Sequence, residues 1–136
     1  MAGYSGTPLV RKLGIKADYR VRIGGAPGDY AELIRPLPDN VLISSRITSD
    51  IHIWNFFTRS KTALAKSLPK MLKQIRQDGM IWISWPKKAS GVTSTVTEDT
   101  VRELALPLGL VDIKVCAIDN TWSGLKLVIR KELRHN

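Results

Sequence analysis

An uncharged run at residues 80–85, MIWISW, sets the strictest limit on how this chain can fold. Each of its residues is apolar or small, Gly79 precedes it, Pro86 follows it, and helix-like segments lie on both sides. A short run without alternation between apolar and polar positions is typical of a strand buried on both faces. Such strands lie inside mostly parallel sheets that helices cover on both faces. We therefore predict an α/β fold with residues 80–85 in its central strand.

The chain has 136 residues, the usual size of one domain, and we expect a single unit over residues 1–136. Glycines and a proline break residues 1–18, which we interpret as an N-terminal lead-in. Residues 8–13 are predicted to form one or two helical turns that end at Gly14. The lead-in has enough apolar residues to pack on the domain, namely Leu9, Val10, Leu13 and Ile15.

The cellular location is predicted from what the sequence lacks. No apolar run approaches the roughly 20 residues of a membrane span, and the N-terminus does not have the order of a signal peptide. We therefore expect a cytoplasmic protein without a membrane partner. The one cysteine, Cys116, excludes an internal disulfide, and its place in an apolar alternation favours a packed side chain over a nucleophile.

Three strands are predicted before the central one, at residues 19–23, 41–47 and 51–57. The loop GGAPG at residues 24–28 follows the first strand, and Asp29 can cap a short helix that ends near Arg35. Only three residues join the second strand to the third, and three residues span about 10 Å. The second strand is therefore either short or antiparallel to the first, because a parallel return needs about 20 Å. We lean to the antiparallel strand.

Two helices and a hairpin are predicted around and after the central strand. Ser60 can cap a helix over residues 61–77, which either kinks at Pro69 or divides there into two helices. Thr95 or Thr97 can cap a second helix, which Pro107 and Gly109 end, and the sequence TVTE at residues 95–98 fits a capping box. Residues 111–118 and 125–131 are predicted as a terminal hairpin, the first strand half-buried near an edge.

The chain contains five motifs: YSGTP, KLGIK, WPKKASG, LPLGLVDIKVCA and TWSGLKL, at residues 4–8, 12–16, 85–91, 106–117 and 121–127. In these motifs it resembles a small uncharacterised bacterial family with a Rossmann-like fold similar to that of S-adenosylmethionine-dependent methyltransferases. The resemblance covers nearly the whole chain and implies a twisted, mostly parallel sheet of about six strands with helices on both faces and a C-terminal antiparallel hairpin. It implies no established activity.

The chain departs from the methyltransferase pattern where that pattern binds its cofactor. A methyltransferase has an acidic residue on its first strand, whereas this chain has Arg20 and Arg22 there, and Asp29 comes only after the glycine turn. The second strand of the family ends in an acid for the ribose hydroxyls, whereas residues 45–47 read SRI. These departures predict that the cofactor pocket is dismantled.

The resemblance places the first, third and central strands side by side and parallel, so their carboxyl ends form one rim of the sheet. Ligands of such folds bind beyond the carboxyl ends, where small loops and helix starts offer N–H groups to phosphate or carboxylate. The alternative is that the glycines only form a turn and the cations are solvated. The residues that we expect to bind an anionic ligand are Gly24, Gly25, Gly28, Arg59, Lys87 and Lys88.

Other residues that could carry chemistry have structural interpretations. Trp54 and Trp82 are expected in the core, and Trp85 and Trp122 are expected to cover the sheet end, although exposed tryptophans could stack on bases. His52 is expected to be a hydrogen-bonded core side chain, and Asn55 either reaches the rim or is a satisfied core amide. No metal spacing and no catalytic residue can be argued.

The functional prediction is a non-catalytic, methyltransferase-like module that needs no cofactor and binds an anionic small molecule or a protein partner at the rim. One alternative is a methyltransferase that holds S-adenosylmethionine in an atypical site. A third class is a nucleic-acid binder, because 21 Lys and Arg against 12 Asp and Glu give a net charge of +9, which favours anionic partners. The charges are scattered, however, and a basic soluble surface is an equal explanation.

Overall fold

The computed structural model describes residues 7–135 of the chain. Most of the YSGTP motif and the first six residues of the N-terminal lead-in lie outside these residues. In the rest of the lead-in, helix α1 (Leu9–Lys12) is followed by Gly14, and Val10, Leu13 and Ile15 are buried in the core cluster that contains Trp82. None of the helices in the described part is long and apolar enough to cross a membrane.

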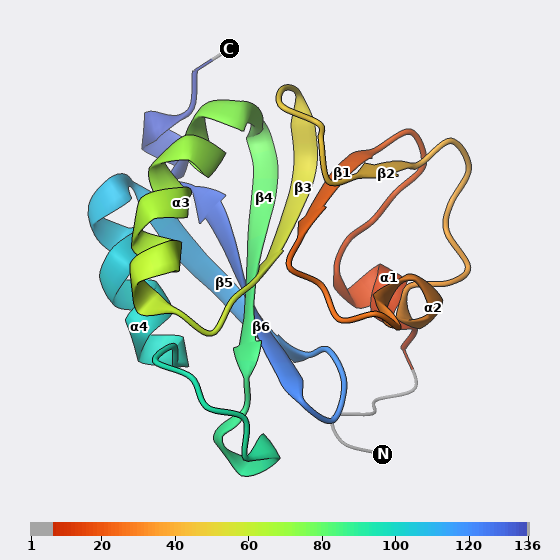
Figure 1. Cartoon of the computed structure of the whole chain (residues 1–136). Coiled ribbons are helices and arrows are strands. Elements are labelled where there is room, and N and C mark those ends of the chain that lie inside the picture. The colour runs from red at the N-terminus through yellow and green to blue at the C-terminus, as the bar shows by residue number, and fades with distance from the viewer. Residues whose placement is uncertain (1–6, 136) are drawn as a thin grey trace.

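The strands form one six-stranded sheet, which confirms the predicted fold class (Figure 1). Its order is β2-β1-β3-β4-β6-β5, with β2, β1, β3 and β4 parallel and β6 antiparallel to both β4 and β5. The central strand of the prediction is an inner strand, and the terminal hairpin closes one edge. The bounds are β1 (Arg20–Gly24), β2 (Leu42–Ser44), β3 (Ile51–Phe57), β4 (Ile75–Pro86), β5 (Leu110–Ala117) and β6 (Trp122–Ile129).

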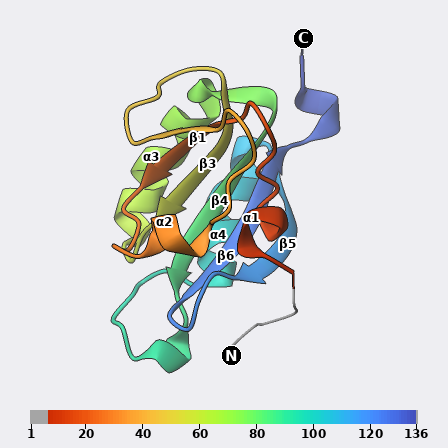
Figure 2. The same ribbon diagram turned by 90° about the vertical axis from the view of Figure 1, so that its right-hand side faces the viewer.

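Helices cover both faces of the sheet (Figures 1 and 2). The long helix α3 (Lys61–Gln74) and α4 (Glu98–Ala105) lie on one face, and α1 with α2 (Tyr30–Leu33) lies on the other. Each face has its own core cluster, centred on Leu64, Leu68 and Ile83 under α3, and on Leu13, Trp82 and Phe57 under α1 and α2. Short 3-10 turns complete the chain at Lys88–Ser90, Leu106–Leu108 and Lys131–Leu133.

The antiparallel second strand was the wrong alternative. β2 runs parallel to β1 and has only three residues, so residues 45–50 are left to carry the chain back to the start of β3. Six residues span about 20 Å when extended, which is enough for that return. The return segment is held on the sheet by Ile47, which is buried in the α3-side core and whose carbonyl accepts a hydrogen bond from Arg22 at 2.6 Å.

The boundary between α3 and β4 also differs from the prediction. Helix α3 is a single helix that runs through Pro69 and ends at Gln74, not Gln77, and Ser60 caps it by accepting a hydrogen bond from the Ala63 N–H. β4 then begins at Ile75 and contains Gly79, which therefore does not stop the helix. A Cβ on Gly79 would lie 2.9 Å from the Ile51 carbonyl oxygen, so glycine permits the close approach of β4 to β3.

Two local patterns near the hairpin differ in part from the prediction. Thr97, one of the two expected caps, does cap α4, but its capping box pairs it with Thr100 and does not consist of residues 95–98. The Thr95 hydroxyl instead accepts a hydrogen bond from the Lys61 N–H. In β5 the alternation fails at a register shift between Asp112 and Lys114, because the shift leaves Ile113 and Val115 exposed. β5 is the edge strand, as expected, and Cys116 is buried, as expected.

The start of β1 is tied to β3 through His52, which yields a pH-dependent contact. The Arg20 N–H donates a hydrogen bond of 2.9 Å to His52 Nδ1, and the His52 ring stacks on Tyr19 at 4.3 Å. The side chain is hydrogen-bonded as predicted, but it is only half-buried. Burial, and then the charge of Arg76, lowers the pKa of His52, so the folded protein favours the neutral ring that accepts this bond.

We predict that this contact makes stability fall as the pH drops from about 7.5 to about 5.5. The unfolded chain takes up the His52 proton at a higher pH than the folded chain, so protons favour unfolding in this window. Denaturant unfolding of His52→Asn, which keeps an acceptor but does not titrate, should show a flatter pH dependence. His135→Asn is the matched control, and a slope that is unchanged in His52→Asn would contradict the assignment.

Candidate functional site

The six residues expected at the rim do lie at one end of the sheet, because β1, β3 and β4 are parallel. Gly24 is the last residue of β1, and Gly25 and Gly28 lie in the loop between β1 and α2. Arg59 follows β3, and Lys87 with Lys88 follows β4. The structure nevertheless separates them: Gly25 and Gly28 border one pocket, Lys88 borders a second hollow and Arg59 a third.

The pocket beside the glycine loop has a volume of about 560 Å³ and opens between the carboxyl ends of β1 and β2. It lies where a parallel sheet of this kind binds ligands. The space of the pocket is therefore retained, whereas its lining has none of the acids whose absence led to the prediction of a dismantled cofactor pocket. The lining residues are Ile23, Gly25, Ala26, Pro27, Gly28, Tyr30, Ala31, Ile34, Arg35, Leu37, Ile43, Ser44 and Ser45.

Gly25 is required for the shape of this loop. Its φ is +68°, in the left-handed region, and a Cβ there would lie 2.5 Å from the carbonyl oxygen of Phe57. The loop consequently turns directly against the end of β3. Gly28 is different, because a Cβ on it would meet nothing within 4 Å. The two glycines of the loop therefore have different roles, one in backbone geometry and one in leaving the pocket mouth open.

A buried polar network fixes the helix that forms one wall of the pocket. Ser84 Oγ donates to Asn55 Oδ1 at 3.2 Å, and Asn55 Nδ2 donates to the Tyr30 hydroxyl at 2.5 Å. Asn55 and Ser84 are fully buried, and Tyr30 is almost so. Burial raises the pKa of Tyr30, so its hydroxyl stays protonated at neutral pH. Asn55 is thus a satisfied core amide that connects α2 to β3 and β4, and it does not bind at the rim.

The charge of the pocket is the opposite of what an adenosyl cofactor with ribose hydroxyls would require. Among the described residues that line it there is no Asp or Glu, and Arg35 is the one charged side chain. Arg35 lies 3.8 Å from Glu32, and both side chains are largely exposed, so this ion pair contributes little stability. Arg35 is therefore free to turn toward an anion in the pocket.

The other predicted cations do not border this pocket: Lys87 is held by a hydrogen bond, and Lys88 and Arg59 border other hollows. Lys87 Nζ donates to the Asp119 carbonyl oxygen at 2.9 Å and so ties the end of β4 to the β5–β6 turn. Lys88 borders a hollow of about 370 Å³ with Trp85, and Arg59 borders one of about 390 Å³ with residues 93–95. Sequence reasoning placed these three at the right end of the sheet but missed Arg35, whose one signal was its position near the end of the short helix predicted after Asp29.

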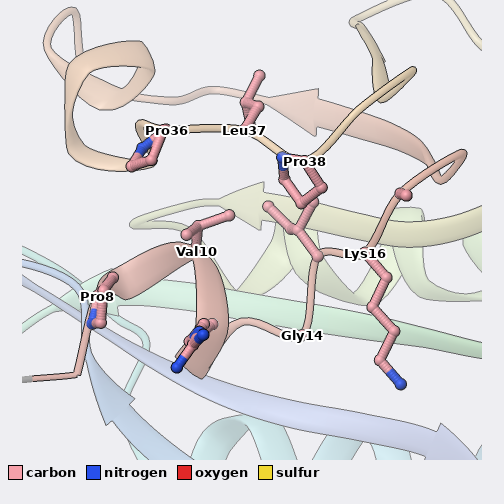
Figure 3. Close-up of a pocket in the computed structure, with 10 residues that line it drawn as sticks. Pro8, Val10, Gly14, Lys16, Pro36, Leu37 and Pro38 are labelled. Carbon is pink, nitrogen blue, oxygen red and sulfur yellow. The ribbon is translucent and has the colours of Figure 1, made fainter.

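A hollow of about 870 Å³ lies away from the strand ends (Figure 3). It separates the α1 segment from residues 36–38, and Pro8, Val10, Pro36, Leu37 and Pro38 form its walls. Arg11 and Lys16 also border it, and the Lys16 side chain extends away from residues 36–38. We prefer the pocket at β1 and β2 as the candidate site because it lies at the carboxyl ends of parallel strands, where such folds bind ligands.

Several residues considered for chemistry are structural. Trp54, Trp82 and Trp85 are buried, and Trp122 packs edge-on against Phe57 at 5.2 Å, so none presents a free ring for base stacking. Burial raises the pKa of the Cys116 thiol, which disfavours a nucleophilic thiolate. The residues described here contain no group of His, Cys, Asp or Glu side chains that could hold a metal ion.

Solved structures of similar architecture identify the fold class of this protein. A proposed type 11 methyltransferase from Sulfolobus solfataricus is similar over 96% of this chain and 94% of its own, with a TM-score of 0.65 and 13% identity. The ribosomal protein L11 methylase from Lactobacillus delbrueckii subsp. bulgaricus is similar over 89% of this chain and 74% of its own, with a TM-score of 0.56 and 8% identity. At these identities the similarity establishes a methyltransferase-like Rossmann fold and no activity.

Sequence comparison then gives the family. A family model described as "Protein of unknown function (DUF3052)" matches residues 44–131, so the chain belongs to that family. The expected family resemblance is thereby confirmed. A search of curated proteins found no significant match. Neither comparison assigns a ligand or a reaction to the pocket.

We predict that Gly25→Ala lowers the free energy of unfolding by at least about 2 kcal/mol, through left-handed backbone strain and the contact with Phe57. Gly28→Ala, the matched control in the same loop, should change it by less than about 0.5 kcal/mol. Denaturant unfolding of the two variants measures both values. Equal stability of the two variants would show that the loop is not held against β3 as described.

Proposed function

We propose that this protein is a methyltransferase-fold binding module that takes an anionic small molecule in the pocket between β1 and β2, without transferring a methyl group. The observation that carries the proposal is the pocket itself: about 560 Å³ of space at the ligand edge of the sheet, bordered by a glycine loop and Arg35 and by no carboxylate. The volume is in the usual range for small-molecule sites, about 300–1,000 Å³.

The chemistry of the lining supports a ligand with both an apolar and an anionic part. Ile23, Ile34, Leu37 and Ile43 offer apolar contact, while the Ser44 and Ser45 hydroxyls and the loop N–H groups can donate hydrogen bonds. A phosphate or carboxylate group would accept these bonds and pair with the Arg35 guanidinium. The anionic group would also find no acidic side chain in the lining to repel it.

Binding without catalysis is supported by the ionisable groups in the pocket. Burial keeps the Tyr30 hydroxyl protonated at neutral pH, so it does not suit the role of a general base. The other described residues of the lining include no His, Cys, Asp or Glu. The proposal therefore assigns no catalytic residue to this site.

A second candidate function is methyl transfer with S-adenosylmethionine, because the neighbours of known fold are described as methyltransferases and the pocket lies at the edge where such folds bind ligands. This candidate requires the cofactor to bind without an acidic partner for its ribose. It also predicts that the cationic sulfonium compound stabilises the protein. The anionic-ligand proposal predicts no such stabilisation.

Thermal unfolding in the presence of test compounds separates the two. We predict that pyrophosphate or a nucleoside phosphate raises the Tm, since a ligand at 100 times its Kd adds about 2.7 kcal/mol. Arg35→Gln should lose most of this shift, because the one charged group of the lining is gone. Lys88→Gln, in a separate hollow, is the matched control and should retain it.

The opposite results discriminate among the sites. Loss of the shift in Lys88→Gln but not in Arg35→Gln would move the anion site to the end of β4 and contradict the pocket assignment. Stabilisation by S-adenosylmethionine across a millimolar titration, with no response to any anion, would replace the proposal with the methyltransferase alternative.

A further inference from the structure

Two lysines face each other on the hairpin at the β5 edge of the sheet. Lys114 of β5 and Lys126 of β6 are register partners in an antiparallel pair, so their side chains lie on the same face. That face is the one covered by α1, because Cys116, two residues after Lys114, belongs to the core cluster of α1. Lys126 is also the register partner of Trp82, another member of that cluster.

A third lysine reaches this place from the α1 segment. Trp82 Nε1 donates a hydrogen bond of 3.0 Å to the Leu13 carbonyl oxygen, which fixes the chain after α1 over β4 and β6. Lys16 follows in this segment, is exposed, and extends away from the residue 36–38 side of its hollow (Figure 3). The positive charge of Lys16, like that of Lys114, contributes to lowering the pKa of Lys126.

The three lysines have no counter-charge in the structure. Within residues 7–135, none of the salt bridges includes Lys16, Lys114 or Lys126, and none of these ammonium groups donates a hydrogen bond to the protein. Like charges directly opposite each other on a sheet destabilise it. Burial, and then the charges of Lys114 and Lys16, lowers the pKa of Lys126, which is the electrostatic consequence of this arrangement.

We propose that Lys16, Lys114 and Lys126 form a binding surface for a chain of phosphate groups, of the kind that a single-stranded nucleic acid or an inorganic polyphosphate carries. Neighbouring phosphates would neutralise the opposed lysines, and each ammonium group can donate to phosphate oxygens. A repeating anion fits three adjacent cations better than a single phosphate does.

This lysine surface is separate from the pocket of the proposed function. The pocket opens at β1 and β2, whereas the lysines lie over β6 and β5, at the other edge of the six-stranded sheet. Its recognition uses no base stacking, since the four tryptophans are buried or packed against other side chains. The surface would consequently bind the phosphate groups and would not distinguish base sequences.

The test measures fluorescence anisotropy of a labelled 20-nucleotide single-stranded DNA over a series of salt concentrations. The variant Lys16→Gln/Lys114→Gln/Lys126→Gln should bind at least tenfold more weakly than wild type. The slope of log K against log salt concentration should flatten by about two, since each single-strand phosphate contact contributes about 0.7. A matched control, Lys66→Gln/Lys70→Gln/Lys73→Gln, removes three exposed lysines from α3 and should keep the wild-type affinity and slope.

Competition with long-chain polyphosphate and with orthophosphate identifies the source of the phosphates. Displacement by polyphosphate at matched phosphate concentration, but not by orthophosphate, supports the proposal, and direct binding of polyphosphate alone assigns the surface to that polymer. Equal weakening in the two triple variants would show that only net charge matters and would overturn the proposal, as would the absence of binding to either polymer. The Tm of Lys16→Gln/Lys114→Gln/Lys126→Gln should equal or exceed that of wild type, because this variant removes the repulsion between the lysines.

Discussion

The burial of β4 on both faces is the constraint on which the rest of the structure depends. Ile81, Ile83 and Trp85 pack under α3 and α4, while Trp82 packs under α1 on the opposite face. Burying such a side chain stabilises the fold by about 1.5–3 kcal/mol, so neither face can be left to water. The chain therefore needs a helical layer on each side. The short N-terminal segment serves as part of one layer, and the Trp82–Leu13 hydrogen bond holds it there.

The shortness of β2 shapes the pocket and explains the arginines of β1. Because β2 stops at Ser44, the return segment crosses the α3-side face of the sheet without a helix of its own. Arg22 supports that segment by donating to the Ile47 carbonyl and lying 4.3 Å over the Trp54 ring. The opposite side of β1 faces α2, and the space between α2 and the end of β2 remains open as the pocket. The basic strand that departs from the methyltransferase pattern thus has a structural role.

The sequence predicted those elements whose pattern is local and strong. The double-sided apolar run, the strand at residues 51–57, the Ser60 cap and the hairpin could all be read from adjacent residues. The direction of β2 could not, because it depends on how many residues pair, and Gly79 was misread because its contact with Ile51 lies across the sheet. The rim was located correctly at the level of strand ends. Arg35 was missed because the sequence shows no pocket there: the space forms only when β2 pairs with β1 in parallel and brings Ile43 and Ser44 opposite the loop after β1.

The distribution of acids connects the two anion-binding proposals. Carboxylates are concentrated around two arginines: Glu98, Asp99 and Asp112 contact Arg102, and Asp50 and Asp78 contact Arg76. These arrangements hold the pKa values of Asp78 and Asp112 below their usual range and use the acids to join strands and helices. Asp119 is used in the same way, since it accepts two backbone N–H groups of the β5–β6 turn. The surplus positive charge is thereby left on side chains that have no partner or, as in Arg35, only a weak exposed ion pair. Arg35 at the pocket and the lysines of the lysine surface are such side chains, at opposite edges of one sheet. Each group can therefore bind an anion without breaking a contact that stabilises the fold.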